Sequence, residues 1–188
     1  MTLTEMKKKI LGMIEELDRD EKSLTSDEDI ATKLNDTINQ VMFELARMKK
    51  IPEYVQMEVK EGDLIRFSDI ASESGFEVYQ IDKVDGAKYE TKAHGTIIKA
   101  LEDGTLEIDF FKYPERITEK TSGSYEFELS DDVLEILPYG VAGDLLKTDV
   151  SMNYGRTFTE EYERKIQRLD SRYAMGTFSV EGGVSWLI

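Results

Sequence analysis

The chain has 188 residues, a length typical of one domain, and 40% of them are hydrophobic, which is enough for a core. It contains no cysteine, which excludes disulfides, thiolate nucleophiles and cysteine-based metal sites. No apolar run approaches the roughly 18 residues that span a membrane, and residues 1–10 lack the pattern of a signal peptide. We therefore expect a protein that is made in a cytoplasm and has no membrane partner.

The charge is strongly acidic, with 39 acidic and 24 basic residues and a net charge of −15. A protein that grips nucleic acid by its phosphates needs a basic patch, and the longest basic runs are Lys7 to Lys9 and Lys49-Lys50. A soluble acidic surface is the simplest interpretation. A more specific one is a surface that lies near DNA and repels its phosphates, so that the DNA slides past.

Residues 1–53 are predicted to form two helices. Apolar residues recur at helical spacing from Leu3 to Leu17 and again from Ile30 to Leu45. The second helix is expected to begin at Ser26, with Asp29 three residues later as in a capping box. It should end near Ile51, because Pro52 disfavours helix in the residue before it. Each helix has a narrow apolar stripe and so buries one face.

Residues 54–129 are rich in Val, Ile, Tyr and Phe, with turn residues between short runs. Strands are predicted at 64–67, 76–84, 96–101 and 105–113, and again where Tyr125, Phe127 and Leu129 alternate. Asp103-Gly104 predicts a tight hairpin between two of these strands, since type I′ turns need positive φ at both central residues. About five short strands imply a small antiparallel sheet or barrel.

Residues 130–173 return to helical patterns. Ser130 is a candidate N-cap, and Pro138 either kinks a helix or begins the next one. Small residues at Gly140 and Gly143 would allow close helix packing. After a loop at 151–155, Thr157 and Glu160 predict a capping box for the last helix. Its apolar stripe is Phe158, Tyr162, Ile166, Leu169 and Tyr173.

Residues 174–188 are predicted to form an extended C-terminal tail. Exposed apolar residues at a chain end are unfavourable in water unless another surface covers them. The tail either folds back on its own β residues or anchors the chain to a partner. The candidate partner-binding residues are Phe178, Val180, Trp186, Leu187 and Ile188.

Together these patterns predict an α+β fold. The N- and C-terminal helices form one helical bundle, because neither half alone has enough apolar surface for a core. A small antiparallel β module is inserted between them, and the tail extends from the end.

Catalytic arrangements are scarce in the sequence. His94 is the only histidine, so one chain cannot build a multi-histidine metal site. No GxSxG elbow and no phosphate-binding glycine motif occurs. The acidic runs 27–29 and 131–132 lie at helix starts, where capping explains them. The acidic segment 18–21 lacks the spacing of an EF-hand loop. We predict no catalytic, cofactor or metal site, and a structural protein in preference to an enzyme.

Three segments resemble the head–tail adaptors, or connector and tail tubular proteins, of tailed double-stranded DNA phages. In this family a Pro-Tyr pair and small residues open a helix, as in Leu137 to Leu146, and a helix with Tyr-Glu closes the bundle, as in Phe158 to Leu169 with Glu161-Tyr162-Glu163. The stretch from Ile30 to Arg47 resembles the family's second helix. A β module inserted between helices is also familiar in this family. The resemblance covers the helical parts, which make up about half of the chain.

The resemblance implies a ring, most commonly of twelve copies, in the neck of the virion between capsid and tail. The partners it implies are the chain itself, the portal protein and the next neck or tail protein, with DNA passing through without sequence-specific binding. The C-terminal tail of the chain would reach the portal or a neighbouring copy, and the β module would face the next ring or the tail of the virion. The alternatives are a tail terminator or tail-tube component, a cytoplasmic binding module and a hydrolase.

Overall fold

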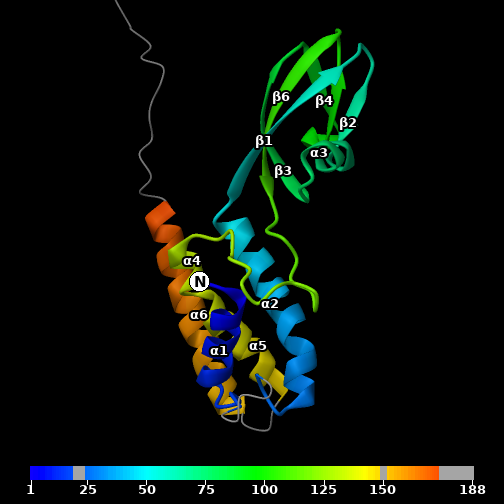
Figure 1. Ribbon diagram of the computed structural model, residues 1–188. Coiled ribbons are helices and arrows are strands. Elements are labelled where there is room, and N and C mark those ends of the chain that lie inside the picture. The colour runs from blue at the N-terminus through cyan, green and yellow to red at the C-terminus, as the bar shows by residue number, and fades with distance from the viewer. Residues whose placement is uncertain (19–23, 149–151, 174–188) are drawn as a thin grey trace, which may run out of the picture.

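The computed structural model describes residues 1–18, 24–148 and 152–173. Helices and antiparallel strands are combined in it, so the α+β prediction is confirmed. Figure 1 shows most helices gathered in one part, while the strands and helix α3 form a second part that projects from one end of it. Within the described residues, no helix has both the length and the apolar character needed to cross a membrane.

The helical part is built around a short apolar helix. Its elements are α1 (Leu3–Met13), α2 (Glu28–Met48), α4 (Asp131–Leu134), α5 (Leu137–Leu145), the 3-10 turn η2 (Leu146–Thr148) and α6 (Met152–Tyr173). Helix α5 contacts α1, α2 and α6, and most of its residues are buried. A helix that is apolar on all sides is stable only when neighbours cover it. The amphipathic helices α1, α2 and α6 supply that cover. Pro138 lies in the first turn of α5, which agrees with the second of the two predicted alternatives, the start of a new helix.

Helix α1 is shorter than its apolar pattern. It begins with a capping box in which Thr2 N–H donates to Glu5 Oε2 (2.8 Å) and Glu5 N–H donates to Thr2 Oγ1 (3.3 Å). It ends at Met13, and Glu15 has a left-handed φ of 62°. Leu17, the last residue of the predicted stripe, is exposed.

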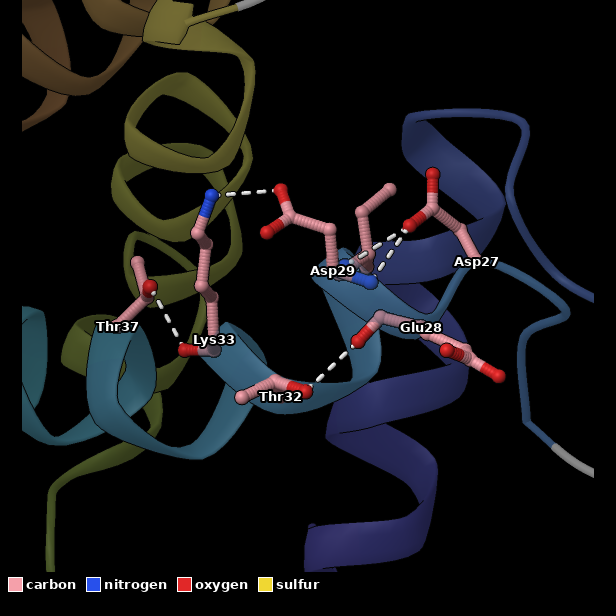
Figure 2. Close-up of polar contacts among 7 residues, drawn as sticks. Asp27, Glu28, Asp29, Thr32, Lys33 and Thr37 are labelled. Atoms are coloured by element: carbon pink, nitrogen blue, oxygen red, sulfur yellow. Dashed lines mark hydrogen bonds and ion pairs between the residues drawn. The ribbon is translucent and has the colours of Figure 1, made fainter.

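Helix α2 begins one residue later than predicted. The N-cap is Asp27, not Ser26, and its Oδ1 accepts hydrogen bonds from the backbone N–H groups of Asp29 (2.9 Å) and Ile30 (3.1 Å), as Figure 2 shows. Asp29 does not cap; it forms an ion pair with Lys33 (2.6 Å) one turn later. The helix ends at Met48, three residues before the predicted end, because Ile51 already belongs to a strand.

Asp27→Ala should lower the free energy of unfolding by about 1 kcal/mol, because two N–H groups of the first turn lose their acceptor. Ser26→Ala is the matched control and should change it by less than about 0.5 kcal/mol. Urea denaturation measures both values. A larger effect of Ser26→Ala would show that Ser26, and not Asp27, is the N-cap of α2.

The β part contains two three-stranded antiparallel sheets. One has the order β1-β6-β3 and the other β2-β5-β4, and α3 packs against the strands. Buried apolar residues from both sheets and from α3 share one core, separate from the helical core. The elements are β1 (Ile51–Val59), β2 (Leu64–Arg66), α3 (Phe67–Ser74), β3 (Val78–Gly86), β4 (Tyr89–Lys92), η1 (Ala93–Gly95), β5 (Ile97–Ala100) and β6 (Gly104–Lys112).

The hairpin predicted at Asp103-Gly104 is wrong. Strands β5 and β6 lie in different sheets, β5 beside β2 and β4 and β6 between β1 and β3. The Asp103 carboxylate accepts a hydrogen bond from Glu61 N–H (2.8 Å), and a Cβ on Gly104 would lie 2.9 Å from the Cβ of Ala87. The glycine is thus needed where two segments pass closely.

Helix α3 is an element that the sequence patterns did not indicate. The Asp69 carboxylate stabilises its first turn by accepting a hydrogen bond from Arg66 N–H (2.8 Å).

Residues 113–130 lie along the helical part. The alternation of Tyr125, Phe127 and Leu129 does not produce the predicted strand, since only Glu126 forms a single bridge, with Thr2. The apolar residues of this segment pack into the helical core instead. Buried Asn39 of α2 fastens the segment, donating from Nδ2 to Ile117 O (2.7 Å) and accepting at Oδ1 from Ile117 N–H (2.8 Å).

The final helix begins earlier than predicted. Helix α6 starts at Met152, so the expected loop at 151–155 is helical from residue 152 onward and Thr157 lies inside the helix. Glu160 forms an ion pair with Arg156 Nε (2.8 Å) instead of completing a capping box with Thr157. Ser130 does occupy the N-cap of α4, but its side chain makes no capping hydrogen bond.

Candidate functional site

The titratable residues with possible chemistry are dispersed. His94 lies on the surface in η1 with a left-handed φ of 57°. Asp27 caps α2, and Asp132 forms an ion pair with Lys49 at the opposite end of that helix. Across the described ranges, no group of three or more His, Asp and Glu side chains is placed to hold a metal ion. The candidate tail residues Phe178, Val180, Trp186, Leu187 and Ile188 lie outside the described residues.

The helical part has a groove between α2 and α6, with α5 and η2 beneath it. We call it the helical groove; its volume is about 440 Å³. Its lining residues are Gln40, Val41, Glu44, Met48, Gly140, Asp144, Lys147, Thr159, Tyr162, Glu163, Ile166 and Gln167. Three of these residues are buried and form the floor, Val41, Gly140 and Tyr162, while Gln40, Glu44, Lys147, Glu163 and Gln167 are exposed.

Two glycines of α5 allow close helix packing, and one of them, Gly140, lines the helical groove. A Cβ on Gly140 would lie 2.7 Å from Tyr162 Cε2 and 2.8 Å from Val41 Cγ1. A Cβ on Gly143 would lie 2.8 Å from Thr159 Oγ1. Helices α2 and α6 therefore approach the α5 backbone more closely than any side chain on these positions would allow, which confirms the predicted role in close packing.

Tyr162 links the groove to the core. Its side chain is 91% buried, given a relative exposure of 9%. Burial, together with the nearby Glu44 carboxylate, raises the pKa of the Tyr162 phenol far above its usual range. The hydroxyl thus stays protonated at any physiological pH, and the ring serves as a packing surface against Gly140.

The charges around the helical groove are mostly negative. Asp144 and Lys147 form an ion pair and compensate each other. Glu44 on α2 and Glu163 on α6 are exposed, and neither makes an ion pair with any residue that the structure describes. The groove consequently presents two uncompensated carboxylates above an apolar floor, a combination that favours a basic occupant.

A row of aromatic rings joins the two parts of the molecule. Phe43 of α2 contacts Tyr113 (ring centroids 5.0 Å apart), Tyr113 contacts Tyr79 of β3 (4.8 Å), and Tyr79 stacks on Phe111 of β6 (6.3 Å). Tyr79 Oη also donates to the carbonyl of Ala46 in α2 (3.2 Å). Aromatic pairs contribute about 0.5–1.5 kcal/mol beyond their buried area, so this row fixes how the β part sits on α2.

Cations cover the rings of this junction. The Arg47 guanidinium lies 5.3 Å from the centroid of Tyr113 and donates from Nε to its hydroxyl (2.7 Å). Lys50 Nζ lies 4.4 Å above Phe111, and the Arg116 guanidinium lies 5.0 Å from Phe43. Much of the positive charge near the junction is therefore engaged in cation–π contacts within the subunit.

A buried lysine closes the junction from the inner side. Lys112 is 5% exposed, and its Nζ lies 3.2 Å from Glu128 Oε1 and 3.6 Å from Glu53 Oε2. The same ammonium sits 3.6 Å above the Phe76 ring. Through these two ion pairs, Lys112 connects strand β1 to the segment that follows β6. The burial of Lys112 could be predicted from the sequence, because Leu106, Ile108 and Phe110 alternate along β6 and position 112 continues the same inward face.

The sequence matches no known protein family and no curated protein.

Proposed function

We propose that this chain is a head–tail adaptor of a tailed double-stranded DNA phage, a structural subunit whose ring extends the DNA channel beneath the portal. The observation that carries the proposal is the interrupted helical part. Helices from both ends of the chain, α1, α2, α5 and α6, share one core, and the β part enters between α2 and α4. A shared core of helices from both ends of the chain supports the bundle with an inserted β module that the sequence resemblance implies.

The surface charge supports the same proposal. A channel subunit must let DNA pass without holding it, and a net charge of −15 opposes phosphate binding. The cations at the junction are engaged with aromatic rings, and Lys112 is buried between two carboxylates. These four basic side chains are therefore not free to grip a DNA backbone.

The braced junction suits a subunit that transmits position between two rings. The aromatic row, the Tyr79–Ala46 hydrogen bond and the Lys112 ion pairs all oppose rotation of the β part about the end of α2. In the proposed neck, the helical parts lie side by side in the ring and the β parts offer a platform to the next neck or tail protein.

Deletion of residues 176–188 should abolish stable attachment to the portal, because the proposed tail anchor, including Trp186, is lost. The measurement is co-sedimentation of the purified protein with its portal. The unchanged thermal unfolding of the truncated chain would show that the helical part remains folded. Full portal binding by the truncated chain would contradict the anchoring role.

A further inference from the structure

We infer that adjacent copies of this chain bind each other through two different patches, the outer face of α1 on one copy and the helical groove on the next. The inference deepens the proposed adaptor function and rests on it for the expectation of a closed ring. A ring with head-to-tail contacts needs two distinct patches on each subunit that complement each other. The described part of the molecule offers such a pair.

The first patch is the outer face of α1, formed by Lys8, Lys9 and Gly12. All three are exposed, and no described residue forms an ion pair with either lysine. Glu5, the nearest acid one turn earlier, is engaged in the capping box with Thr2. The face therefore presents two uncompensated positive charges.

Gly12 is the second feature of this face. A Cβ on Gly12 would have no atom within 4 Å, and its φ is not left-handed. Glycine inside a helix costs roughly 0.5–1 kcal/mol relative to alanine, and no contact within the subunit requires it here. A neighbouring subunit that approaches the α1 backbone closely would require it, just as α6 requires Gly143 inside the subunit.

The second patch is the helical groove. Its charge is opposite to that of the α1 face. The groove carries two uncompensated negative charges, Glu44 and Glu163, and the α1 face carries two uncompensated positive charges, Lys8 and Lys9. Its volume of about 440 Å³ can receive several side chains, and its floor is apolar enough to hold the aliphatic parts of lysines.

The two patches are separate on the subunit. Helix α1 packs on α5 but supplies no residue to the lining of the groove, which comes from α2, α5, η2 and α6. One copy can therefore use both patches at once, donating α1 to one neighbour and its groove to the other. A contact of this kind propagates around a ring instead of stopping at a dimer.

Cysteine cross-linking tests the contact directly, because the natural chain has no cysteine. One protein carries Lys9→Cys, and a second, enlarged by a tag, carries Glu44→Cys or Glu163→Cys. A short bis-maleimide linker should join the two proteins into a mixed dimer on a denaturing gel. Lys9→Cys mixed with Glu61→Cys, an exposed position in the β part, is the control and should give at least tenfold less product. Equal yields in the test and control mixtures would overturn the inference.

Charge reversal gives an independent readout. Lys8→Glu added to the Lys9→Cys protein should reduce the mixed-dimer yield several-fold, and so should Glu44→Lys added to the Glu163→Cys protein. Mixing one reversed protein with the other should restore it, which misfolding of either variant would not do. Gly12→Ala should raise the unfolding midpoint of the isolated subunit while it lowers the yield. Failure of the reversed pair to recover would overturn the contact.

The outcome separates this contact from the adaptor proposal. Cross-linking between α1 and the groove in a protein that never binds a portal would support the contact and contradict the adaptor function. Portal-bound rings that give no α1–groove product would support the adaptor function and overturn the contact.

Discussion

Replacing Asn39 by alanine should lower the free energy of unfolding by about 2–5 kcal/mol. The Asn39 amide is buried and is the partner of both the N–H and the C=O of Ile117, 78 positions away in the sequence. Each backbone group left unsatisfied in an apolar core costs roughly 1–3 kcal/mol. The segment 113–130 would also lose the bond that fastens it to α2.

Asn35, one turn earlier on the same helix, is the matched control. Its Oδ1 is buried but has no hydrogen-bond partner in the structure, so Asn35→Ala leaves no group newly unsatisfied. We expect a change below about 1 kcal/mol, partly offset by the better helix propensity of alanine. Urea denaturation of both variants gives the comparison, and similar losses at the two positions would contradict the proposed clamp.

Gly140→Val should lower the free energy of unfolding by about 3 kcal/mol. The new Cβ alone would overlap the Tyr162 ring and the Val41 side chain, and the two methyl groups of valine would add to the strain. Relief requires α6 or α2 to move away from α5, which would also change the shape of the helical groove. Assembly should therefore decline together with stability.

Gly12→Val provides the control for backbone and propensity effects. Gly12 also lies in a helix, but its Cβ would point into open space, so the stability of the isolated subunit should change by less than about 0.5 kcal/mol. Thermal and urea unfolding of the two variants measure the difference. A comparable loss at Gly12 would show that the cost at Gly140 does not come from contact with α2 and α6.

Helical periodicity located the long helices well, because each buries one face in a shared core. The pattern from Ile30 to Leu45 lies within α2, and most of its apolar residues are buried. Ends were less predictable. Asp27, and not Ser26, accepts the hydrogen bonds of the N-cap of α2. Helix α6 begins at Met152, so Thr157 lies inside the helix and Glu160 pairs with Arg156 one turn earlier.

Alternation predicted burial more reliably than strand pairing. Leu106, Ile108 and Phe110 do face one core from β6, as their spacing indicates. Phe127 alternates in the same way but faces the helical core from an extended segment, because burial of alternate residues needs no strand partner. The hairpin prediction at Asp103-Gly104 was wrong because a two-residue turn pattern does not determine which sheet the next strand joins.

The candidate surfaces depend on contacts that sequence spacing does not encode. The helical groove combines Glu44 with Glu163, which are 119 positions apart by residue number and meet only because α2 and α6 both pack on α5. The junction likewise joins Phe43 to Tyr113. Small residues at positions 140 and 143 were the one local signal of the groove, and they predicted the close packing beneath it.

Electron microscopy of the purified protein, alone and mixed with a portal from the same phage, tests the adaptor proposal most directly. We predict rings stacked on the portal in the mixture, with the helical parts side by side and the β parts directed away from the portal. Rings or tubes that form without portal would instead indicate a tail component. No assembly in either sample would contradict the proposal and favour a binding module that acts outside the virion.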